Sequence, residues 1–344
     1  MSDVAIQSFY FFEEIVSKAT STNVTRMKCT LLSFYPDFVE ILKNKTTNSL
    51  YFCCLPLLIG NTMNNTCIVL EGGGLRGAFT CGVLEFLLEN KLNFDRVIGV
   101  SAGACNAASY VSGQIGRNWK VNIEFPSDKR FMGLKYLITK GSYFNMPFVF
   151  KEIPMMLVPF DEKSFYNNPA EVEIVISSLS TGKSLILSKK KIEEIGLDKA
   201  LIATSSIPFL SKPIAIDGQL YYDGGVSDSI PVKYALSKHE KALVVLTRPR
   251  GYRKGETSSK MLIQWAFRKH PAFRDAMLCR NDEYNKTLDY CEQMEHEGKL
   301  FIIAPSAEFQ IGRLEKRLEK RAALYHHGYD LMGKEFENMK AFLQ

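Results

Sequence analysis

A serine between two glycines is the first residue whose surroundings could make it reactive. The motif Gly99-Val100-Ser101-Ala102-Gly103 follows a predicted strand at 94–98 and precedes a predicted helix of small residues at 104–112. A sharp strand-to-helix turn strains the serine backbone, and it requires nearly side-chain-free residues two positions before and after. The helix that follows puts its positive end at Ser101, where a developing alkoxide is stabilised. The pattern predicts a nucleophile elbow supported by both glycines.

A glycine-rich loop precedes this motif. Gly72-Gly73-Gly74-Leu75-Arg76-Gly77 lies between an apolar strand at 67–71 and a helix that runs to about residue 90. As a dinucleotide cradle, the loop would need an acidic residue closing the next strand. That strand instead begins with Asp95 and ends at Ser101. The same glycine N–H groups at a helix start can hold negative charge, so we predict an oxyanion hole.

The base that would activate Ser101 is the next question. The five histidines, His239, His270, His296, His326 and His327, lie at no obvious strand-end loop. Asp223, in Tyr221-Tyr222-Asp223-Gly224-Gly225, ends a short apolar strand, and its two glycines let backbone approach. A carboxylate with a pKa of about 3.9 is a weak base, so Asp223 needs desolvation or a direct hydrogen bond to the hydroxyl. Asp217 and Asp228 are expected as a turn residue and a helix cap.

In this order the three motifs resemble the patatin-like phospholipase family, in its bacterial type, over roughly residues 65–235. The resemblance implies a Ser-Asp dyad without histidine, with Ser101 as nucleophile and Asp223 as general base. It implies oxyanion donors at Gly72, Gly73 and Gly74, and places Arg76 at the family's basic position. The stretch 203–208 also resembles the segment before the family's aspartate. The implied activity is a carboxylic ester hydrolase of the phospholipase A or lysophospholipase type.

No cofactor or metal is expected. The eight cysteines show no C-x-x-C spacing, and no acidic cluster has calcium-loop spacing. Two rival functions remain. One is a carboxylesterase that uses a histidine-containing triad on non-lipid esters. The other is a non-catalytic, lipid-binding regulatory protein.

Apolar strand runs alternate with helical stretches from residue 66 onward. The predicted strands are 66–70, 95–100, 171–178, 182–187, 242–247 and 299–303, and the predicted helices are 76–90, 102–113, 192–204, 231–238, 309–324 and 328–343. The alternation predicts an α/β sheet covered on both faces. With the resemblance, this becomes a three-layer α/β/α patatin-like fold with a mainly parallel central sheet and a helical C-terminal extension. Asp217-Gly218 predicts a hairpin turn.

The 344 residues allow more than one domain. We predict a leader at 1–62, appended or mis-assigned ahead of Met63, a catalytic domain at 63–247, and a basic, helical extension at 248–344. The N-terminus lacks the basic region of a secretory signal. The longest apolar stretch, 50–59, is about half of a bilayer span. These features predict a cytoplasmic protein with peripheral contact at the inner membrane surface.

The net charge of +6 is concentrated in one segment. Nine basic residues stand against Glu256 and Asp275 between Arg248 and Arg280. Three aromatic residues in that segment, Trp265, Phe267 and Phe273, could anchor it on anionic lipid. Nucleic acid is the competing partner, which we do not expect, and a solvated face is the plainest alternative.

The predicted substrate is a phospholipid or another fatty acyl ester, which requires apolar surface for the chain. Residues 131–166 hold nine aromatic residues and four methionines. They are a candidate for a lid or an acyl channel, with packed core as the alternative.

Overall fold

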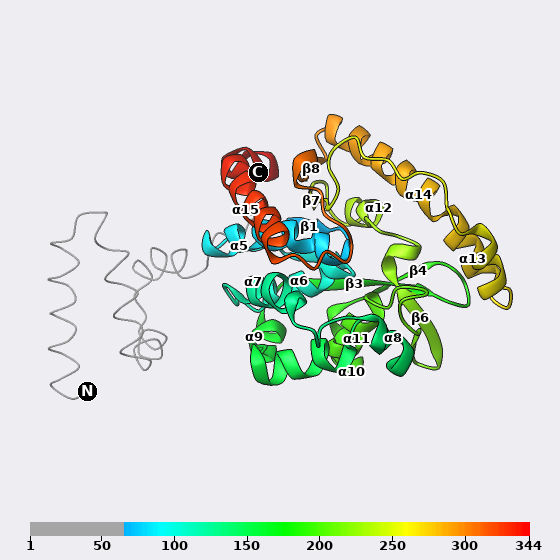
Figure 1. Cartoon of the computed structure of the whole chain (residues 1–344). Helices are drawn as coiled ribbons and strands as arrows, with labels where there is room; N and C mark the ends of the chain where they lie inside the picture. Colours follow the sequence, from blue (N-terminus) through cyan, green and yellow to red (C-terminus); the bar gives the residue numbers. More distant parts are fainter. Residues whose placement is uncertain (1–64) are drawn as a thin grey trace, which may run out of the picture. The chain divides into compact units, whose positions relative to one another are not determined.

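The computed structural model describes residues 65–344, and the predicted leader 1–62 lies outside them. A central sheet with helices on both sides organises this part of the chain (Figure 1). Its strands are β1 (Cys67–Leu70), β2 (Arg96–Val100), β3 (Glu171–Ser178), β4 (Ser184–Leu187), β5 (Ile214–Ile216), β6 (Gln219–Asp223), β7 (Ala242–Val245) and β8 (Leu300–Ile303). Its α-helices are α5 (Ala78–Glu89), α6 (Ala102–Val111), α7 (Arg117–Trp119), α8 (Leu134–Lys140), α9 (Glu162–Asn167), α10 (Lys189–Ile195), α11 (Leu197–Thr204), α12 (Val232–Leu236), α13 (Lys260–Ala266), α14 (Pro271–His296) and α15 (Leu318–Leu343). Short 3-10 or π segments are η1 (Gly74–Gly77), η2 (Lys120–Glu124), η3 (Phe125–Ser127), η4 (Phe148–Leu157), η5 (Gly224–Val226) and η6 (Ala307–Phe309).

The strands of residues 65–344 form one sheet in the order β5-β6-β3-β2-β1-β7-β8, and β4 also pairs with β3. In this order, the neighbouring strands β3, β2, β1, β7 and β8 all run parallel to one another. The pairs β3/β4, β3/β6 and β5/β6 are antiparallel. Asp217 and Gly218 join β5 to β6 with φ angles of 49° and 74°, as a two-residue hairpin requires. The mainly parallel sheet and the hairpin are therefore as predicted.

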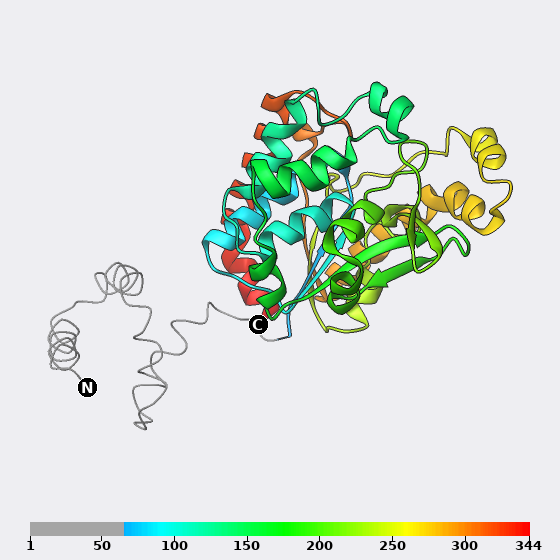
Figure 2. The ribbon, with the colours of Figure 1, turned by 90° about the horizontal axis from the view of Figure 1, so that it is seen from below.

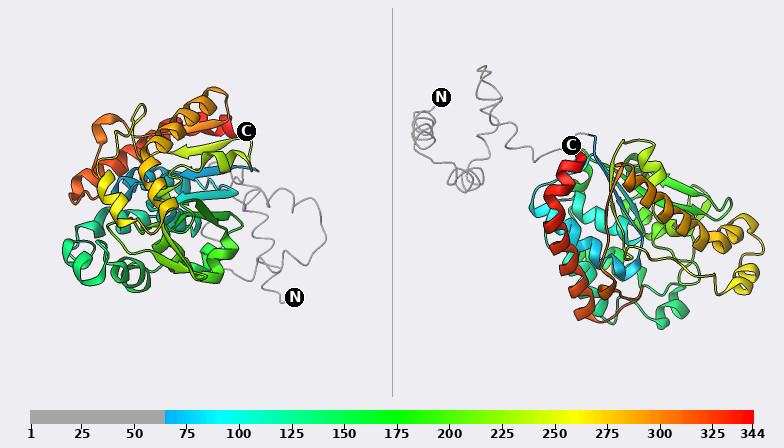
Figure 3. Two further views of the ribbon diagram at one scale, coloured as in Figure 1. Left: turned by 90° about the vertical axis from the view of Figure 1, so that its right-hand side faces the viewer. Right: turned by 90° about the horizontal axis from the view of Figure 1, so that it is seen from above.

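Alternate residues of each central strand enter opposite layers of the core. Ile68 and Leu70 of β1 pack in a cluster with residues of α5, α6, α11 and α15. Cys67 and Val69 face the other way, into a cluster with α12 and α14. The views in Figure 2 and Figure 3 show these helices on the two sides of the sheet. Burial on both faces explains why these strands are continuous apolar runs, and it confirms the three-layer architecture.

Two helix predictions are wrong at glycines. The single helix predicted at 192–204 is divided at Gly196, which has a φ of +91°. The two helices predicted at 309–324 and 328–343 are instead one helix, α15. Gly328 does not break α15, because α5 packs closely against the helix at this residue. A Cβ there would come within 2.3 Å of the Phe79 carbonyl oxygen.

The residues after 247 contribute to the sheet and to both of its faces. Strand β8 pairs with β7, while α14 and α15 pack on opposite sides. Helix α14 was missed from the sequence because its buried stripe is thin, with five buried residues among the 26 of the helix. A domain boundary at residue 247 stays a prediction. Among the described helices, each is too short or too polar to cross a bilayer.

Candidate active site

Ser101 occupies the sharp turn between β2 and α6. Its backbone has a φ of 53° and a ψ of −122°, an unusual conformation for a residue with a side chain. A Cβ on Gly99 would lie 2.5 Å from the Ala104 Cα, and one on Gly103 would lie 2.4 Å from the Leu70 carbonyl oxygen. Neither position can carry a side chain without moving backbone. The turn therefore has the nucleophile-elbow geometry that the sequence predicts.

Strand β3 brings Asp223 to Ser101. The pairing of β2 with β3 ends at Val100 and Val175, and the next β3 residue, Ile176, pairs with Asp223 of β6. Strand β4 pairs with Ile176 along one edge of β3. Strand β6 therefore pairs along the other edge of β3, which β2 occupies up to Val175. Strands β2 and β6 run in opposite directions, so their C-terminal ends meet. Residues 122 positions apart in the sequence are thereby neighbours.

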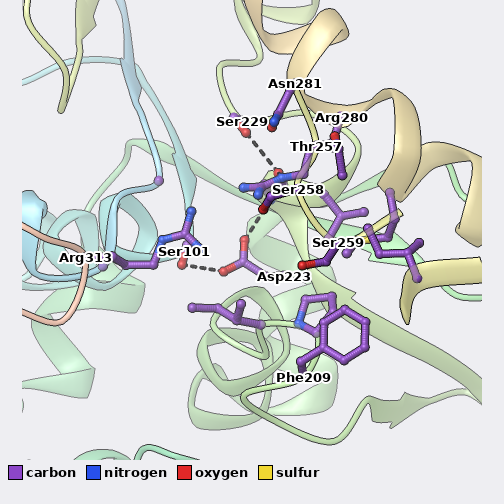
Figure 4. A pocket seen from close by; sticks show the side chains of 18 of the residues that line it. Ser101, Phe209, Asp223, Ser229, Thr257, Ser258, Ser259, Arg280, Asn281 and Arg313 are labelled. Carbon is purple, nitrogen blue, oxygen red and sulfur yellow. Dashed lines mark hydrogen bonds between the residues drawn. The ribbon is translucent and has the colours of Figure 1, made fainter. Parts of the chain in front are cut away.

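A short hydrogen bond joins the two side chains (Figure 4). Ser101 Oγ donates to Asp223 Oδ2 at 2.7 Å, and Asp223 Oδ1 accepts from the Gly225 N–H at 2.7 Å. Ser101 is 6% exposed and Asp223 is 7% exposed. Burial raises the pKa of Asp223, which the Ser101 and Gly225 hydrogen bonds and the charges of Arg280 and Arg313 only partly offset. A carboxylate with a raised pKa is a stronger base, and the predicted role of Asp223 as a general base requires this.

Two further hydroxyls hold this pair, and sequence reasoning gave neither a role. The Thr204 Oγ1 accepts from the Ser101 N–H at 2.9 Å and donates to the Val175 carbonyl at 2.6 Å. Ser177 donates to the Asp223 carbonyl oxygen at 2.8 Å. Thr204 lies in the stretch 203–208 that resembled the family, which was the available signal. These bonds fix the backbone on both sides of the Ser101–Asp223 contact.

The glycine-rich loop lies against Ser101. Gly72, Gly73 and Gly74 line the same pocket as Ser101 and Asp223. A Cβ on Gly72 would lie 3.2 Å from the Ser101 Cβ, so the loop backbone passes directly beside the nucleophile. Within residues 65–344, the N–H groups of Gly72 and Gly73 donate to no other protein group. They are available as donors to an oxygen of a bound ester.

The remaining motif residues support the loops around this site. Gly77 accepts a hydrogen bond from Asn106 Nδ2 at 3.0 Å, which ties the end of η1 to α6. Gly224 lies so close to β3 that a Cβ would come within 2.2 Å of the Val175 carbonyl oxygen. Arg76 is buried, and its Nε has no hydrogen-bond partner among the described residues. Burial, followed by the charge of Arg248, lowers the pKa of Arg76 to about 10.

The pocket at Ser101 has a volume of about 290 Å³. Its lining includes residues that the sequence did not indicate, from the segment before α13, from α13 and α14, and from the loop before α15. They are Glu256, Thr257, Ser258, Ser259, Ile263, Met277, Arg280, Asn281 and Arg313. Three residues after α11, Ile207, Pro208 and Phe209, form another part of the wall. Within residues 65–344, no group of His, Cys, Asp or Glu side chains could hold a metal ion.

The other candidates lie elsewhere. None of the five histidines lines this pocket. The His239 Nε2 accepts from Arg96 Nε at 2.9 Å, and the His327 Nε2 accepts from the Ser306 N–H at 2.9 Å. Asp217 pairs with Lys191 at 2.7 Å, in the hairpin turn.

The segment 131–166, a candidate acyl channel, also contributes no residue to the pocket. Phe131, Met132 and Phe148 are buried in a separate cluster. Met155 and Met156 are 74% and 75% exposed. The packed-core alternative therefore holds for the first three residues, and the two methionines face solvent.

The fold and the site together define an α/β protein with a nucleophile elbow, a buried serine–aspartate contact and a glycine-rich loop beside them. Residues 68–236 match the family described as Patatin-like phospholipase. The chain belongs to the patatin-like phospholipase family. Residues 270–344 match a second family, described as a domain of unknown function (DUF6363).

Two curated relatives each match about half of the chain. The uncharacterized protein YjjU of Escherichia coli (strain K12) is 28% identical over 192 residues, which are 52% of this chain and 50% of that protein. The patatin-like phospholipase domain-containing protein 2 of Homo sapiens is 26% identical over 175 residues, 48% of this chain and 33% of that protein. The matches thus span about half or less of these relatives. The crystal structure of VipD from Legionella pneumophila aligns with a TM-score of 0.42 at 13% identity, over 80% of this chain and 67% of that one.

Proposed function

We propose that the chain is a serine acyl hydrolase that cleaves fatty acyl esters of lipids through Ser101 and Asp223. Membership of the patatin-like phospholipase family supports a lipid ester as substrate. The observation that carries the proposal is the 2.7 Å hydrogen bond from Ser101 Oγ to the buried Asp223 Oδ2. It joins a serine in a strained turn to a carboxylate whose pKa is raised by burial. A nucleophile and a base within hydrogen-bond reach are the requirement for an activated serine.

The proposed reaction has two steps. In the first, Ser101 Oγ attacks the ester carbonyl carbon while its proton passes to Asp223 Oδ2. The N–H groups of Gly72 and Gly73 hold the negative oxygen of the tetrahedral intermediate. The bond to the alcohol then breaks, and the alcohol leaves with the proton from Asp223. In the second step, water attacks the acyl-Ser101 ester and gives its proton to Asp223, which returns it to Ser101 Oγ as the fatty acid leaves.

A fluorophosphonate probe tests this proposal, because it reacts with activated serines. We expect the purified protein to be labelled at Ser101, and Ser101→Ala to abolish both labelling and hydrolysis of a soluble acyl ester. Ser237→Ala is a matched control, because Ser237 is exposed and its hydroxyl donates to the nearby Tyr234 carbonyl oxygen, away from the pocket. A folded protein that stays unlabelled at Ser101 would refute an activated serine and favour a lipid-binding role. Loss of activity on replacing any one histidine would favour the triad alternative instead.

The sequence predicts contact with a lipid surface over residues 248–280. We propose this contact for α13 and the two residues after Phe267 only. Much of the charge of that segment is used within the protein, since Arg250, Arg253, Lys260 and Arg274 all pair with acidic side chains. Helix α13 has different properties. Met261 is 84% exposed and Trp265 is 67% exposed, while Ile263 of the same helix lines the pocket. An exposed apolar helix face at a pocket mouth suits insertion among lipid headgroups.

Two exposed basic residues, Arg268 and Lys269, follow this helix face and suit an anionic surface. We expect Trp265→Ser to weaken co-sedimentation with vesicles of phosphatidylcholine and phosphatidylserine. The labelling of Ser101 by a soluble probe should not change, because Trp265 lies outside the pocket. Unchanged sedimentation of the Trp265→Ser protein would rule out α13 as the contact.

A further inference from the structure

Two arginines line the pocket and come from the part of the chain beyond the patatin match. Arg280 extends from α14, and Arg313 extends from the loop that precedes α15. Figure 4 shows both at the pocket, with Arg313 reaching toward Ser101 and Asp223. The Arg313 Cγ and carbonyl oxygen lie against Gly74, where a Cβ would be within 2.6 Å and 2.7 Å of them. The glycine-rich loop therefore makes room for Arg313 beside the nucleophile.

Neither guanidinium has an acidic partner of its own. Within residues 65–344, Arg280 and Arg313 form no ion pair, and Arg280 Nε donates to the Gly225 carbonyl oxygen at 2.5 Å. Asp223 is already bonded to Ser101 and Gly225, and Glu256 pairs with Lys260. Buried or half-buried charges of one sign are unfavourable unless a counter-charge is present. Asp223 and Glu256 also line the pocket, and the charge of Asp223 acts on both arginines. Among the described residues neither acid forms an ion pair with Arg280 or Arg313, so the two guanidinium groups lack a direct acidic partner that a bound anion could supply.

The pKa values of two basic groups reflect the closeness of these positive charges. Burial lowers the pKa of Arg280, and the charge of Arg313 lowers it further, so the two guanidinium groups lie close enough to repel each other. Burial, followed by the charge of Arg280, lowers the pKa of Lys254 to about 6. A bound anion would relieve both repulsions.

We propose that Arg280 and Arg313 form a subsite for the phosphate of an acyl ester substrate, whose ester carbonyl lies at Ser101. This inference rests on the proposed hydrolase function. A planar guanidinium group donates a pair of hydrogen bonds to two oxygens of one phosphate. The same hydrogen bonds to a neutral headgroup are weaker, because the acceptor carries no charge. The polar side chains of Thr257, Ser258 and Asn281 line the pocket near Arg280, and Phe209 lies on the other side of Asp223 (Figure 4). The polar side suits a phosphorylated alcohol, and the apolar side suits the start of an acyl chain.

The test compares two soluble esters that differ only in the phosphate, 1-hexanoylglycerol 3-phosphate and 1-hexanoylglycerol. The measured quantity is the ratio of their kcat/KM values. We expect the wild-type protein to prefer the phosphorylated ester, and Arg313→Gln and Arg280→Gln each to lower the ratio roughly 10- to 100-fold, the size of a charged hydrogen bond. Arg313→Lys should lower it less, because the charge remains. Lys316→Gln is the matched control, since it removes an exposed charge from the same loop.

An arginine that only held Asp223 in place would affect both esters equally. A ratio unchanged in both glutamine variants would therefore overturn the phosphate subsite. Inhibition by inorganic phosphate is a further measurement. If it inhibits cleavage of 1-hexanoylglycerol while the wild-type protein shows no preference for the phosphorylated ester, the anion bound is free phosphate, and the headgroup assignment is wrong.

Binding to an inactive variant separates this inference from the hydrolase proposal. We expect calorimetry to detect glycerol 3-phosphate binding to Ser101→Ala, and the additional change Arg313→Gln to weaken it roughly 10- to 100-fold. If neither ester is cleaved and Ser101 is not labelled, the proposed function fails, and this binding still reports on the subsite. Absence of binding to a folded Ser101→Ala protein would overturn the subsite alone.

Discussion

Replacing Asp223 with asparagine removes the proposed base and keeps the shape of the side chain. The asparagine carbonyl can still accept from the Gly225 N–H, as Asp223 Oδ1 does at 2.7 Å. Its amide nitrogen then faces Ser101 Oγ and cannot accept the proton that Oδ2 receives in the proposed mechanism. Loss of a positioned general base typically costs about 100- to 10,000-fold in rate, or roughly 3–5 kcal/mol in barrier height. We expect kcat for a soluble acyl ester to fall within this range.

The same replacement should not unfold the protein. Burial raises the pKa of Asp223 above its value in the unfolded chain, so the protonated carboxyl favours the folded state. That contribution is fully present below the unfolded pKa and is lost as the pH rises through the folded pKa. At pH 7 the charged Asp223 therefore opposes folding, and asparagine carries no such charge. We expect the Tm of Asp223→Asn to equal or exceed that of the wild type at pH 7, with the difference shrinking toward acidic pH.

Steady-state kinetics across pH, with melting curves of the same samples, provide the assay. Wild-type kcat should fall as the pH drops through the pKa of Asp223, which burial raises, and the asparagine variant should lack this fall at acidic pH. Asp217→Asn is the matched control, because Asp217 is exposed in the hairpin turn and bonded to Lys191. Activity of Asp223→Asn close to that of wild type would exclude Asp223 as the base. A lower Tm at pH 7 would contradict the reasoning on stability.

Two further substitutions test how the site and the fold are held. Thr204→Val keeps the side-chain shape but removes the bonds of Thr204 to the Ser101 N–H and the Val175 carbonyl. We expect the free energy of unfolding in urea to fall by about 1–3 kcal/mol, and the probe to label Ser101 more slowly. An unchanged labelling rate would show that Thr204 does not position the nucleophile. Gly328→Ala puts a Cβ within 2.3 Å of the Phe79 carbonyl oxygen, so we expect it to cost about 1–3 kcal/mol by forcing α5 and α15 apart. Gly255→Ala, which has open space around the new Cβ, should be close to neutral, and equal Tm values for the two variants would contradict the close contact.

The sequence determined the parts of the protein that depend on short-range geometry. The elbow at Ser101 was recognisable from five consecutive residues, and Gly99 lies against Ala104 of the same turn, although Gly103 lies against Leu70 of β1. The hairpin at Asp217 and Gly218 follows from two positive φ angles. The order of the three motifs predicted the family to which the matched region belongs. Buried parallel strands were recognisable as apolar runs, because both of their faces are covered.

Only the tertiary structure decided what lies across from these motifs. Asp223 meets Ser101 because β3 pairs with β2 and then with β6 along one edge, and a strand's pairing partners are not written in its own residues. Arg280 and Arg313 enter the pocket from α14 and the loop before α15, more than 170 positions beyond Ser101. Gly328 lies inside a continuous helix because α5 packs against it, although glycine is a poor helix former. Contacts between distant segments depend on how the helices pack on the sheet, and a local pattern carries no record of that packing.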